Sequence, residues 1–290
     1  MIRMYARQND GLRLMTAGAN PQNALWIDLH CPTGEELALL APLGAPIPTQ
    51  TEIEAIAPSR LIRRQGPYEV LTTLLPLSGD AVAVEPPRAV TFMLTAERLV
   101  TLRHHPQPTL EGFADSAWRA AAGGFGSAQI IAGMMEQLLR QEDARLGEAG
   151  LALGALAGGL AAAKPRRPAD LSGVLSGLAG QEVALDHAHL CLITLQPVLA
   201  HLIATFGENP GLRGTKQQAK MLLRDAQSLA EHRDHLAGRL AQLLTVVQAR
   251  AALKGAEGYR ALTLTLAVLA LIFLGAVAGG CFALRAKGWL

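Results

Sequence analysis

The pattern of apolar and polar positions changes character at about residue 116. Before that point, short apolar runs alternate with turn residues, whereas Leu, Ala and Gly dominate afterwards. Residues 25–29, 68–75, 88–95 and 98–103 are predicted to be strands, and the last two should pair across a short turn. Antiparallel strands interleaved with short helices indicate an α+β domain rather than a doubly wound sheet.

Two short helices are expected within this first third of the chain. Thr33 and Glu36 have the Ser/Thr-x-x-Glu spacing of a capping box, which predicts a helix that continues through Leu40. Residues 49–52 repeat this spacing after a proline, and Pro58 should end the second helix.

Helical patterns continue beyond residue 116, with two interruptions. The glycine-rich stretch 147–159 weakens the prediction of a helix there, because glycine lowers helix propensity. Two prolines within residues 164–168 predict an exposed break between two helical segments.

Residues 215–253 predict one long helix with a seam of apolar side chains. This segment contains no proline and a single glycine. Its apolar positions repeat in steps of three and four, with Arg233 filling one gap: Leu222, Ala226, Leu229, Leu236, Leu240, Leu243 and Val247. Such a helix would be on the order of 58 Å long. We expect a stalk that leads to a membrane and associates with copies of itself, since a rod of this length cannot bury itself inside a small domain.

Residues 261–284 carry no charge and are rich in Leu, Ala, Val, Ile and Phe. A membrane-spanning helix needs about 20 such residues. Arg260 before the run and Arg285 and Lys287 after it favour a span over a buried core helix. The sequence therefore predicts one C-terminal transmembrane helix.

Composition adds several constraints on function. Half of the residues are hydrophobic, 17% are charged and the net charge is +2, so nucleic acid is not indicated as a partner. Cys31, Cys191 and Cys281 are far apart and indicate thiols in a reducing compartment. No signal peptide is recognisable, so the N-terminal part is expected in the cytoplasm. No nucleophile, metal-protease or nucleotide-binding motif is present, so no enzyme and no organic cofactor are predicted.

One group of side chains on the predicted stalk could bind a metal ion. Asp225, Glu231, His232 and Asp234 lie close together in the sequence, with His235 next to them. Imidazoles with carboxylates suit zinc or a similar transition metal, whereas magnesium prefers oxygen ligands. The alternative is a solvated, charged helix face, because no closed set of ligands is visible. The histidine pairs at 104–105 and 187–189 are interpreted as structural.

Several blocks in the same order resemble the CorA-type divalent-cation transporters of bacteria. They are residues 26–29 with 32–36, residues 47–54 with 59–61, the strand pair 90–95 and 98–103, residues 225–234, and the ending 287–290. The resemblance covers nearly the whole chain. It implies a cytoplasmic domain of α/β/α layers, a long stalk helix and two membrane helices, assembled as a pentamer around a pore.

The resemblance also implies a function. Members of this family carry Mg²⁺, and in some cases Co²⁺, Ni²⁺ or Zn²⁺, across the membrane, and acidic residues between neighbouring cytoplasmic domains sense the ion. Their first membrane helix ends in Gly-Met-Asn at the pore mouth. No Gly-Met-Asn occurs in this sequence, and the single apolar run resembles the family's second membrane helix. The first pore helix and the periplasmic loop are therefore expected to be absent.

The sequence thus predicts four regions along the chain. They are an α/β domain over 1–115, its helical part over 116–212, a stalk helix over 213–256, and a transmembrane helix with a short tail over 257–290. The expected function is divalent-cation transport at the bacterial inner membrane with an incomplete pore. Two alternatives remain open: a non-conducting regulatory or binding subunit of a full-length relative, and a decayed or truncated transporter. Asp225, Glu231, His232 and Asp234 are the candidate ion-sensing residues.

Overall fold

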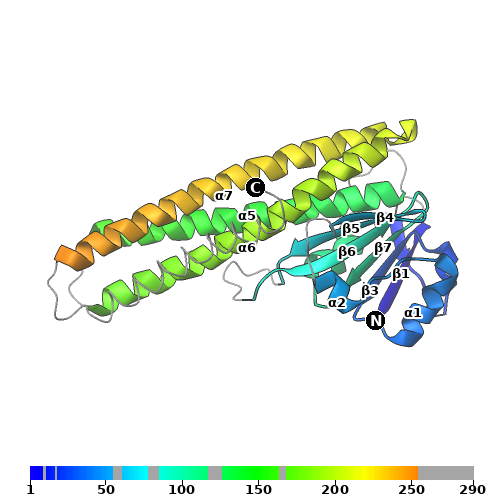
Figure 1. The fold of residues 1–290 in the computed structure, drawn as a ribbon, viewed down its shortest axis with the longest axis horizontal. Helices are drawn as coiled ribbons and strands as arrows, with labels where there is room; N and C mark the ends of the chain where they lie inside the picture. The colour runs from blue at the N-terminus through cyan, green and yellow to red at the C-terminus, as the bar shows by residue number, and fades with distance from the viewer. Residues whose placement is uncertain are drawn as a thin grey trace. The chain divides into compact units, whose positions relative to one another are not determined.

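The computed structural model describes residues 1–8, 11–16, 18–54, 61–77, 85–116, 126–162 and 168–253 (Figure 1). The chain forms two compact units. The first combines Met1–Gly150 with Val183–His235, and the second combines Leu151–Glu182 with Leu236–Leu290. The four predicted regions follow one another along the chain. Each compact unit instead combines two separate stretches of the sequence. The predicted transmembrane helix at 261–284 and the ending at 287–290 lie outside the described residues.

The first unit contains a seven-stranded sheet with the order β2-β1-β3-β7-β6-β5-β4. Neighbouring strands are antiparallel except β3 and β7, which are parallel. The strands are β1 (Ile2–Gln8), β2 (Gly11–Leu14), β3 (Trp26–His30), β4 (Ile62–Gln65), β5 (Tyr68–Leu75), β6 (Arg88–Leu94) and β7 (Leu99–Arg103). The predicted antiparallel pairing of the last two is confirmed, since Val90 lies opposite Arg103 and Leu94 opposite Leu99.

The central strands are buried on both faces. Every residue of β7 is buried, and so is every residue of β6 after its first, Arg88. Trp26 of β3 is completely buried between Tyr5, whose ring stacks at 4.5 Å, and Phe113, whose ring meets it edge-on at 5.8 Å. Its indole nitrogen donates to the Thr101 hydroxyl at 3.1 Å, so its one polar atom is satisfied. The strand predicted at residues 25–29 is therefore confirmed as β3, and it is largely buried.

The predicted capping box at the start of α1 (Gly34–Leu40) is confirmed. The Glu36 amide donates to the Thr33 hydroxyl at 3.3 Å, and the Glu36 carboxylate accepts from the Thr33 amide at 2.9 Å. The same carboxylate accepts from the Ile2 amide and pairs with the amino group of Met1, both at 2.9 Å. These bonds hold the pKa of Glu36 below its ordinary value, and they tie α1 to the first strand.

The other short helices lie around the sheet. They are α2 (Gln50–Glu54), α3 (Pro108–Glu111) and α4 (Phe113–Ser116), with 3-10 helices at Pro21–Asn23, Ala41–Leu43 and Pro210–Leu212. α2 begins where the second capping pattern predicted, because the Thr49 amide donates to the Glu52 carboxylate at 2.8 Å. Pro58, which was expected to end this helix, lies outside the described residues.

Three long helices follow: α5 (Ser127–Ala162), α6 (Pro168–Gly207) and α7 (Arg213–Leu253). The expectation that glycines would weaken the helix over 147–159 is wrong, because α5 runs through that stretch. Leu146, Ala149, Leu153 and Leu160 keep helical spacing and are buried, so packing outweighs low propensity. α5 ends at Ala162 and α6 begins at Pro168, and residues 164–167 of the predicted break lie outside the described residues.

α6 joins the sheet of the first unit through buried polar contacts. The Thr194 hydroxyl lies 2.9 Å from the Thr73 hydroxyl and accepts from the Leu74 amide at 3.0 Å. His201 Nε2 lies 2.9 Å from a carboxylate oxygen of Glu69. Within the described residues, the part of α6 from Ser172 to Gly207 is long and apolar enough to cross a membrane. Because this helix bonds to the sheet, we interpret it as a core helix.

Most of the seam predicted on α7 is buried, but within its own chain, and Leu243 is only half-buried. Leu222, Ala226 and Leu229 are at most 9% exposed. The Gln196 side chain of α6 donates to the Ala226 carbonyl at 3.2 Å, and Gln218 of α7 donates to Glu136 of α5 at 2.8 Å. The expectation that this helix cannot bury itself is therefore wrong in the first unit, where α5 and α6 cover its seam.

The described part of the second unit consists of the end of α5, the beginning of α6 and the end of α7. Its buried residues include Leu153, Leu178, Leu240 and Val247. At Gly177 a Cβ atom would lie 3.0 Å from a methyl carbon of Leu156, so glycine permits the close approach of α6 to α5.

Candidate functional site

The four candidate ion-sensing residues lie on the exposed side of α7. Asp225, Glu231, His232 and Asp234 are all exposed, whereas Ala226 and Leu229 of the seam are buried. The first and last are nine positions apart, which corresponds to about 13 Å along a helix axis. The four side chains therefore spread over the exposed side of the helix and do not form one closed cage.

Arg233 lies among these residues on α7, between His232 and Asp234. Its guanidinium pairs with the Asp234 carboxylate at 3.1 Å and also contacts Nδ1 of His189 on α6. His189, which was interpreted as structural, thus orients an arginine beside two candidate ligands. Because Arg233 occupies a seam position, its side chain extends away from the buried seam, so that the guanidinium contacts Asp234 and His189.

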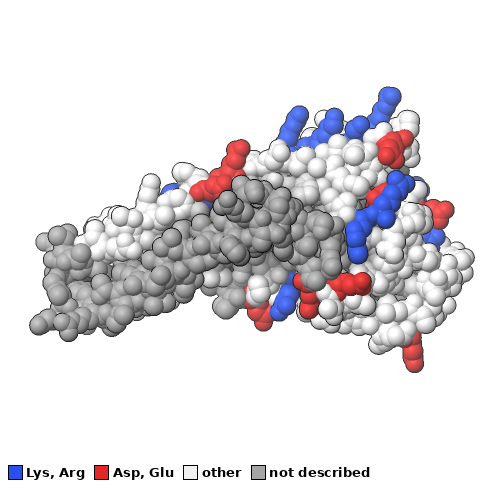
Figure 2. Space-filling model, viewed as in Figure 1, with Lys and Arg blue, Asp and Glu red and all other residues white. Residues whose placement is uncertain are grey.

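Charges on α7 are separated along its length. Its beginning carries basic side chains three or four residues apart, namely Arg213, Lys216, Lys220 and Arg224, and the candidate acidic residues follow. Figure 2 shows basic side chains projecting from the molecule on the side where α7 lies. A divalent cation near this helix would therefore favour the segment from Asp225 to Asp234.

One chain alone does not supply a complete set of metal ligands in the part that the structure describes. Among those residues, no group of three or more His, Cys, Asp or Glu side chains is arranged to hold a metal ion. A structural metal site normally needs about four ligands. If the candidate residues bind a cation, further ligands have to come from water or from a neighbouring copy of the chain.

A charged network is buried in the sheet of the first unit. The Arg103 side chain is fully buried and donates to both carboxylate oxygens of Asp28, at 2.9 and 3.4 Å. The Thr101 hydroxyl donates to the same carboxylate at 2.7 Å, and Glu111 pairs with the guanidinium at 2.9 Å. The two acidic partners raise the pKa of Arg103 against the opposing effect of burial. This network couples β3 and β7 to α3.

A second acidic residue is buried in the helical part of the first unit. Glu142 of α5 is 3% exposed, and one of its oxygens accepts no hydrogen bond from any described residue. Arg145 lies 4.0 Å away, which is too far for a hydrogen bond. Burial raises the pKa of Glu142 to about 7, although the nearby guanidinium opposes this shift. Its charge therefore changes close to neutral pH.

Sequence reasoning missed Asp28 and Glu142 as buried charges, although both left a signal. Asp28 interrupts an apolar strand, and a buried carboxylate needs a charged or hydrogen-bonding partner. Only the fold could identify that partner as Arg103. Glu142 lies four residues after Leu138 and four before Leu146, both of which are buried, so it occupies the apolar face of its helix. His104 and His105 were interpreted as structural, yet both line a cavity.

Comparison with solved structures defines the fold. The chain is similar to the complete CorA magnesium transporter from Methanocaldococcus jannaschii, with a TM-score of 0.69 and 14% identity over 96% of this chain and 86% of that one. It is also similar to the full-length CmaX protein, with a TM-score of 0.64 and 14% identity over 98% and 85% of the two chains. The cytoplasmic domain of ZntB from Vibrio parahaemolyticus RIMD 2210633 matches with a TM-score of 0.63 and 12% identity over 87% and 98%.

No protein-family model matches the chain, and no curated protein matches its sequence. The structural matches nevertheless extend over nearly the whole chain. The protein therefore has the fold of the CorA-type transporters, an α+β domain followed by long helices, as the sequence predicted.

Proposed function

We propose that this chain is a member of the CorA family and acts in transmembrane transport of divalent cations. The single observation that supports this most strongly is the match to a complete magnesium transporter over 96% of the chain. Magnesium is the proposed cargo, with cobalt, nickel or zinc as further substrates. The α+β domain would lie in the cytoplasm and sense the ion, and the protein would reside in the bacterial inner membrane.

The proposed assembly is a homopentamer with one membrane helix per subunit, at residues 261–284. The described seam of α7 is largely covered by the chain's own helices, so self-association would use the exposed side of this helix. A bundle of such spans would present small and hydroxyl-bearing residues, including Thr263 and Thr265, but no charged side chain. Ion selection normally uses rings of backbone carbonyls or of charged side chains, and this span supplies only hydroxyl side chains, so such a pore would be incomplete.

A different function is favoured by one specific observation: no Gly-Met-Asn occurs anywhere in the sequence. On this alternative, the protein is a non-conducting regulatory or binding subunit that joins a full-length relative, or it is a truncated transporter without a transport role. Co-assembly with a complete relative and altered gating of the mixed assembly would support the regulatory role.

Ion uptake by the purified full chain in liposomes separates these functions. Transport predicts that a Mg²⁺-sensitive dye inside the vesicles responds above the level of empty liposomes, and the measurement is repeated with Co²⁺ and Zn²⁺. The control is the same folded, oligomeric protein in vesicles without a cation gradient. Absence of uptake from such protein would contradict autonomous transport and favour the non-conducting subunit.

Ion sensing by α7 makes a separate prediction. Replacing Asp225, Glu231, His232 and Asp234 with alanine together should abolish stabilisation of the full chain by Mg²⁺ or Zn²⁺. A ligand at 100 times its Kd stabilises a protein by about 2.7 kcal/mol, so wild-type protein should show a clear metal-dependent rise in Tm.

The matched control replaces four exposed α7 side chains that are poor metal ligands, Gln217, Gln227, Gln242 and Gln248, with alanine. This variant should keep the metal-dependent rise in Tm. If the first variant responds to metal as wild type does, these four residues do not sense the ion.

A further inference from the structure

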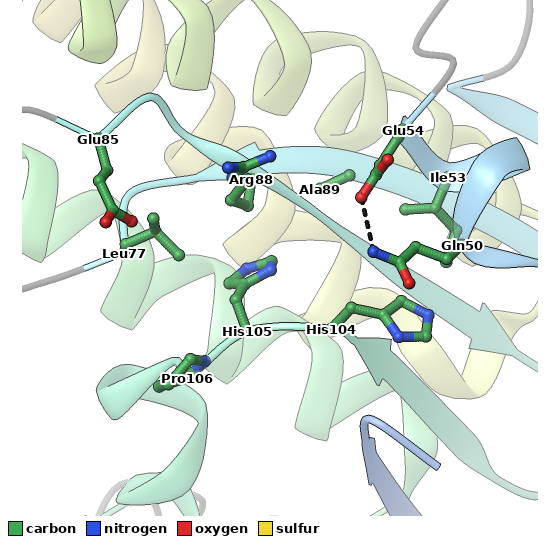
Figure 3. A pocket seen from close by; sticks show the side chains of 10 residues that line it. All are labelled: Gln50, Ile53, Glu54, Leu77, Glu85, Arg88, Ala89, His104, His105 and Pro106. Carbon is green, nitrogen blue, oxygen red and sulfur yellow. Dashed lines mark hydrogen bonds between the residues drawn. The ribbon is translucent and has the colours of Figure 1, made fainter. Parts of the chain in front are cut away.

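A cavity of about 400 Å³ lies at one end of the sheet in the first unit (Figure 3). Its walls come from α2, from the chain after β5, from the beginning of β6 and from the chain after β7. The side chains that decide its chemistry are Ile53, Glu54, Leu77, Arg88, His104 and His105. These groups come from segments far apart in the sequence, so the cavity could not be predicted from a local sequence motif.

Two imidazoles in this cavity have unsatisfied nitrogens. Nε2 of His104 and Nε2 of His105 are both buried, and neither has a hydrogen-bond partner among the described residues. Burial lowers the pKa of His105 to about 4, and the charges of Arg103 and Arg88 add to this effect. The ring is therefore neutral at pH 7 and offers one donor and one acceptor nitrogen. Since buried polar atoms are normally satisfied, these nitrogens indicate a polar occupant.

The cavity also offers charges of both signs. Arg88 is exposed at the beginning of β6 and forms no ion pair with another described residue, and Figure 3 shows the ring of His105 on the side of the cavity near it. Glu54 lies on the α2 side, where its carboxylate accepts a hydrogen bond from the Gln50 side chain at 2.8 Å. That single bond leaves further acceptor sites on the carboxylate.

Two apolar side chains lie beside these charges, on opposite sides of the cavity (Figure 3). Ile53 of α2 and Leu77 after β5 both line the cavity. The lining is therefore complementary to a molecule that has a negative group, a positive group and an apolar part. A volume near 400 Å³ falls toward the small end of known ligand pockets, which suits a compact molecule.

We propose that this cavity binds a free α-amino acid with an apolar side chain. Its carboxylate would pair with the Arg88 guanidinium and accept a hydrogen bond from His105. Its ammonium group would donate to the Glu54 carboxylate, and its side chain would pack against Ile53 and Leu77. A cavity that contains both Arg88 and Glu54 favours a zwitterion. An anion would be repelled by Glu54, and a cation would be repelled by Arg88.

Two other occupants fit the cavity less well. A metal ion is disfavoured, since no three His, Cys, Asp or Glu side chains of the described residues could hold one. A simple anion would find Arg88 but would also face the carboxylates of Glu54 and Glu85, which line the same cavity.

Calorimetric titration of the full chain in detergent at neutral pH tests the proposal with three probes of similar shape. L-leucine carries both charges, 4-methylpentanoate lacks the ammonium group, and 3-methylbutan-1-amine lacks the carboxylate. We expect saturable binding of L-leucine and affinities about tenfold or more weaker for the other two. Binding of 4-methylpentanoate as tight as that of leucine would overturn the zwitterion assignment, and so would absence of saturable leucine binding.

Variants locate the binding. Arg88→Gln and Glu54→Gln should each weaken leucine binding by about tenfold or more, since each removes one charge-assisted contact. Both side chains are exposed, so the variants should fold. The matched control is Arg140→Gln, which removes the same charge from a 76% exposed side chain of α5. If that control weakens binding equally, or if Arg88→Gln does not, the site assignment is wrong.

Discussion

Replacing Asp28 with leucine is expected to lower the free energy of unfolding by about 3–5 kcal/mol, the usual cost of breaking a buried ion pair from one side. The substitution removes a carboxylate that accepts three side-chain hydrogen bonds, two of them from the fully buried Arg103. Glu111 remains as a partner, but its side chain is 35% exposed and compensates only in part. Chemical denaturation of the full chain in detergent measures the change.

The double variant Asp28→Leu with Arg103→Met tests the cause of this loss. Replacing both charges with apolar groups of similar size should recover most of the stability, because no isolated charge then remains buried. The control is Glu97→Gln, since Glu97 is 79% exposed and its pair with Arg98 should contribute little. If Asp28→Leu alone costs less than about 1 kcal/mol, the buried network does not stabilise the fold.

The second large effect concerns Glu142 and pH. Its pKa is about 7 in the folded protein against 4.5 for the free side chain, so the folded state holds the proton more tightly than the unfolded state. This group's contribution to stability is therefore complete below about pH 4.5 and is lost as pH rises through about 7. At 1.36 kcal/mol for each pKa unit, the loss is about 3 kcal/mol.

Glu142→Gln should abolish this dependence, because the amide stays neutral at every pH. Relative to wild type, the variant should be more stable at pH 8 and similar at pH 4.5, and the difference between the two proteins cancels the contributions of all other titrating groups. Glu148→Gln, an exposed substitution on the same helix, should leave the profile unchanged. Equal pH profiles for wild type and Glu142→Gln would show that the carboxyl does not titrate near neutrality.

Local sequence patterns predicted much of the secondary structure. The strand at residue 26, the strand pair β6 and β7, and the helix capped by Thr33 are all where the patterns placed them. These elements depend on interactions within a few residues, namely a capping box, an apolar run and a short turn. Such interactions are encoded locally and can therefore be recognised without the fold.

Elements with weak local patterns were missed. β1 (Ile2–Gln8) mixes apolar and charged residues, and β4 (Ile62–Gln65) is short and polar, so neither showed a clear strand pattern. Both are held by pairing with neighbouring strands, β1 with β2 and β3 and β4 with β5. Their strand structure depends on partners supplied by other parts of the chain.

The long helices were also predicted only in part. A heptad-like pattern correctly predicted that α7 is a helix with a buried stripe, because spacing determines which side chains share a face. It did not identify the partner. The pattern suggested other copies of the chain, whereas α5 and α6 cover the stripe in the first unit, through bonds such as that from Gln196 to the Ala226 carbonyl.

By itself, the sequence determined the α+β character of the first part, the long helices that follow it and the resemblance to CorA-type transporters. It also shows that Gly-Met-Asn occurs at no position. Only the tertiary structure decided which charged side chains meet. Arg103 and Asp28 are 75 residues apart, and the lining of the cavity runs from Gln50 to Pro106. Such contacts arise from the pairing of β3 with β7 and the packing of helices on the sheet, which depend on the whole fold and leave no local pattern.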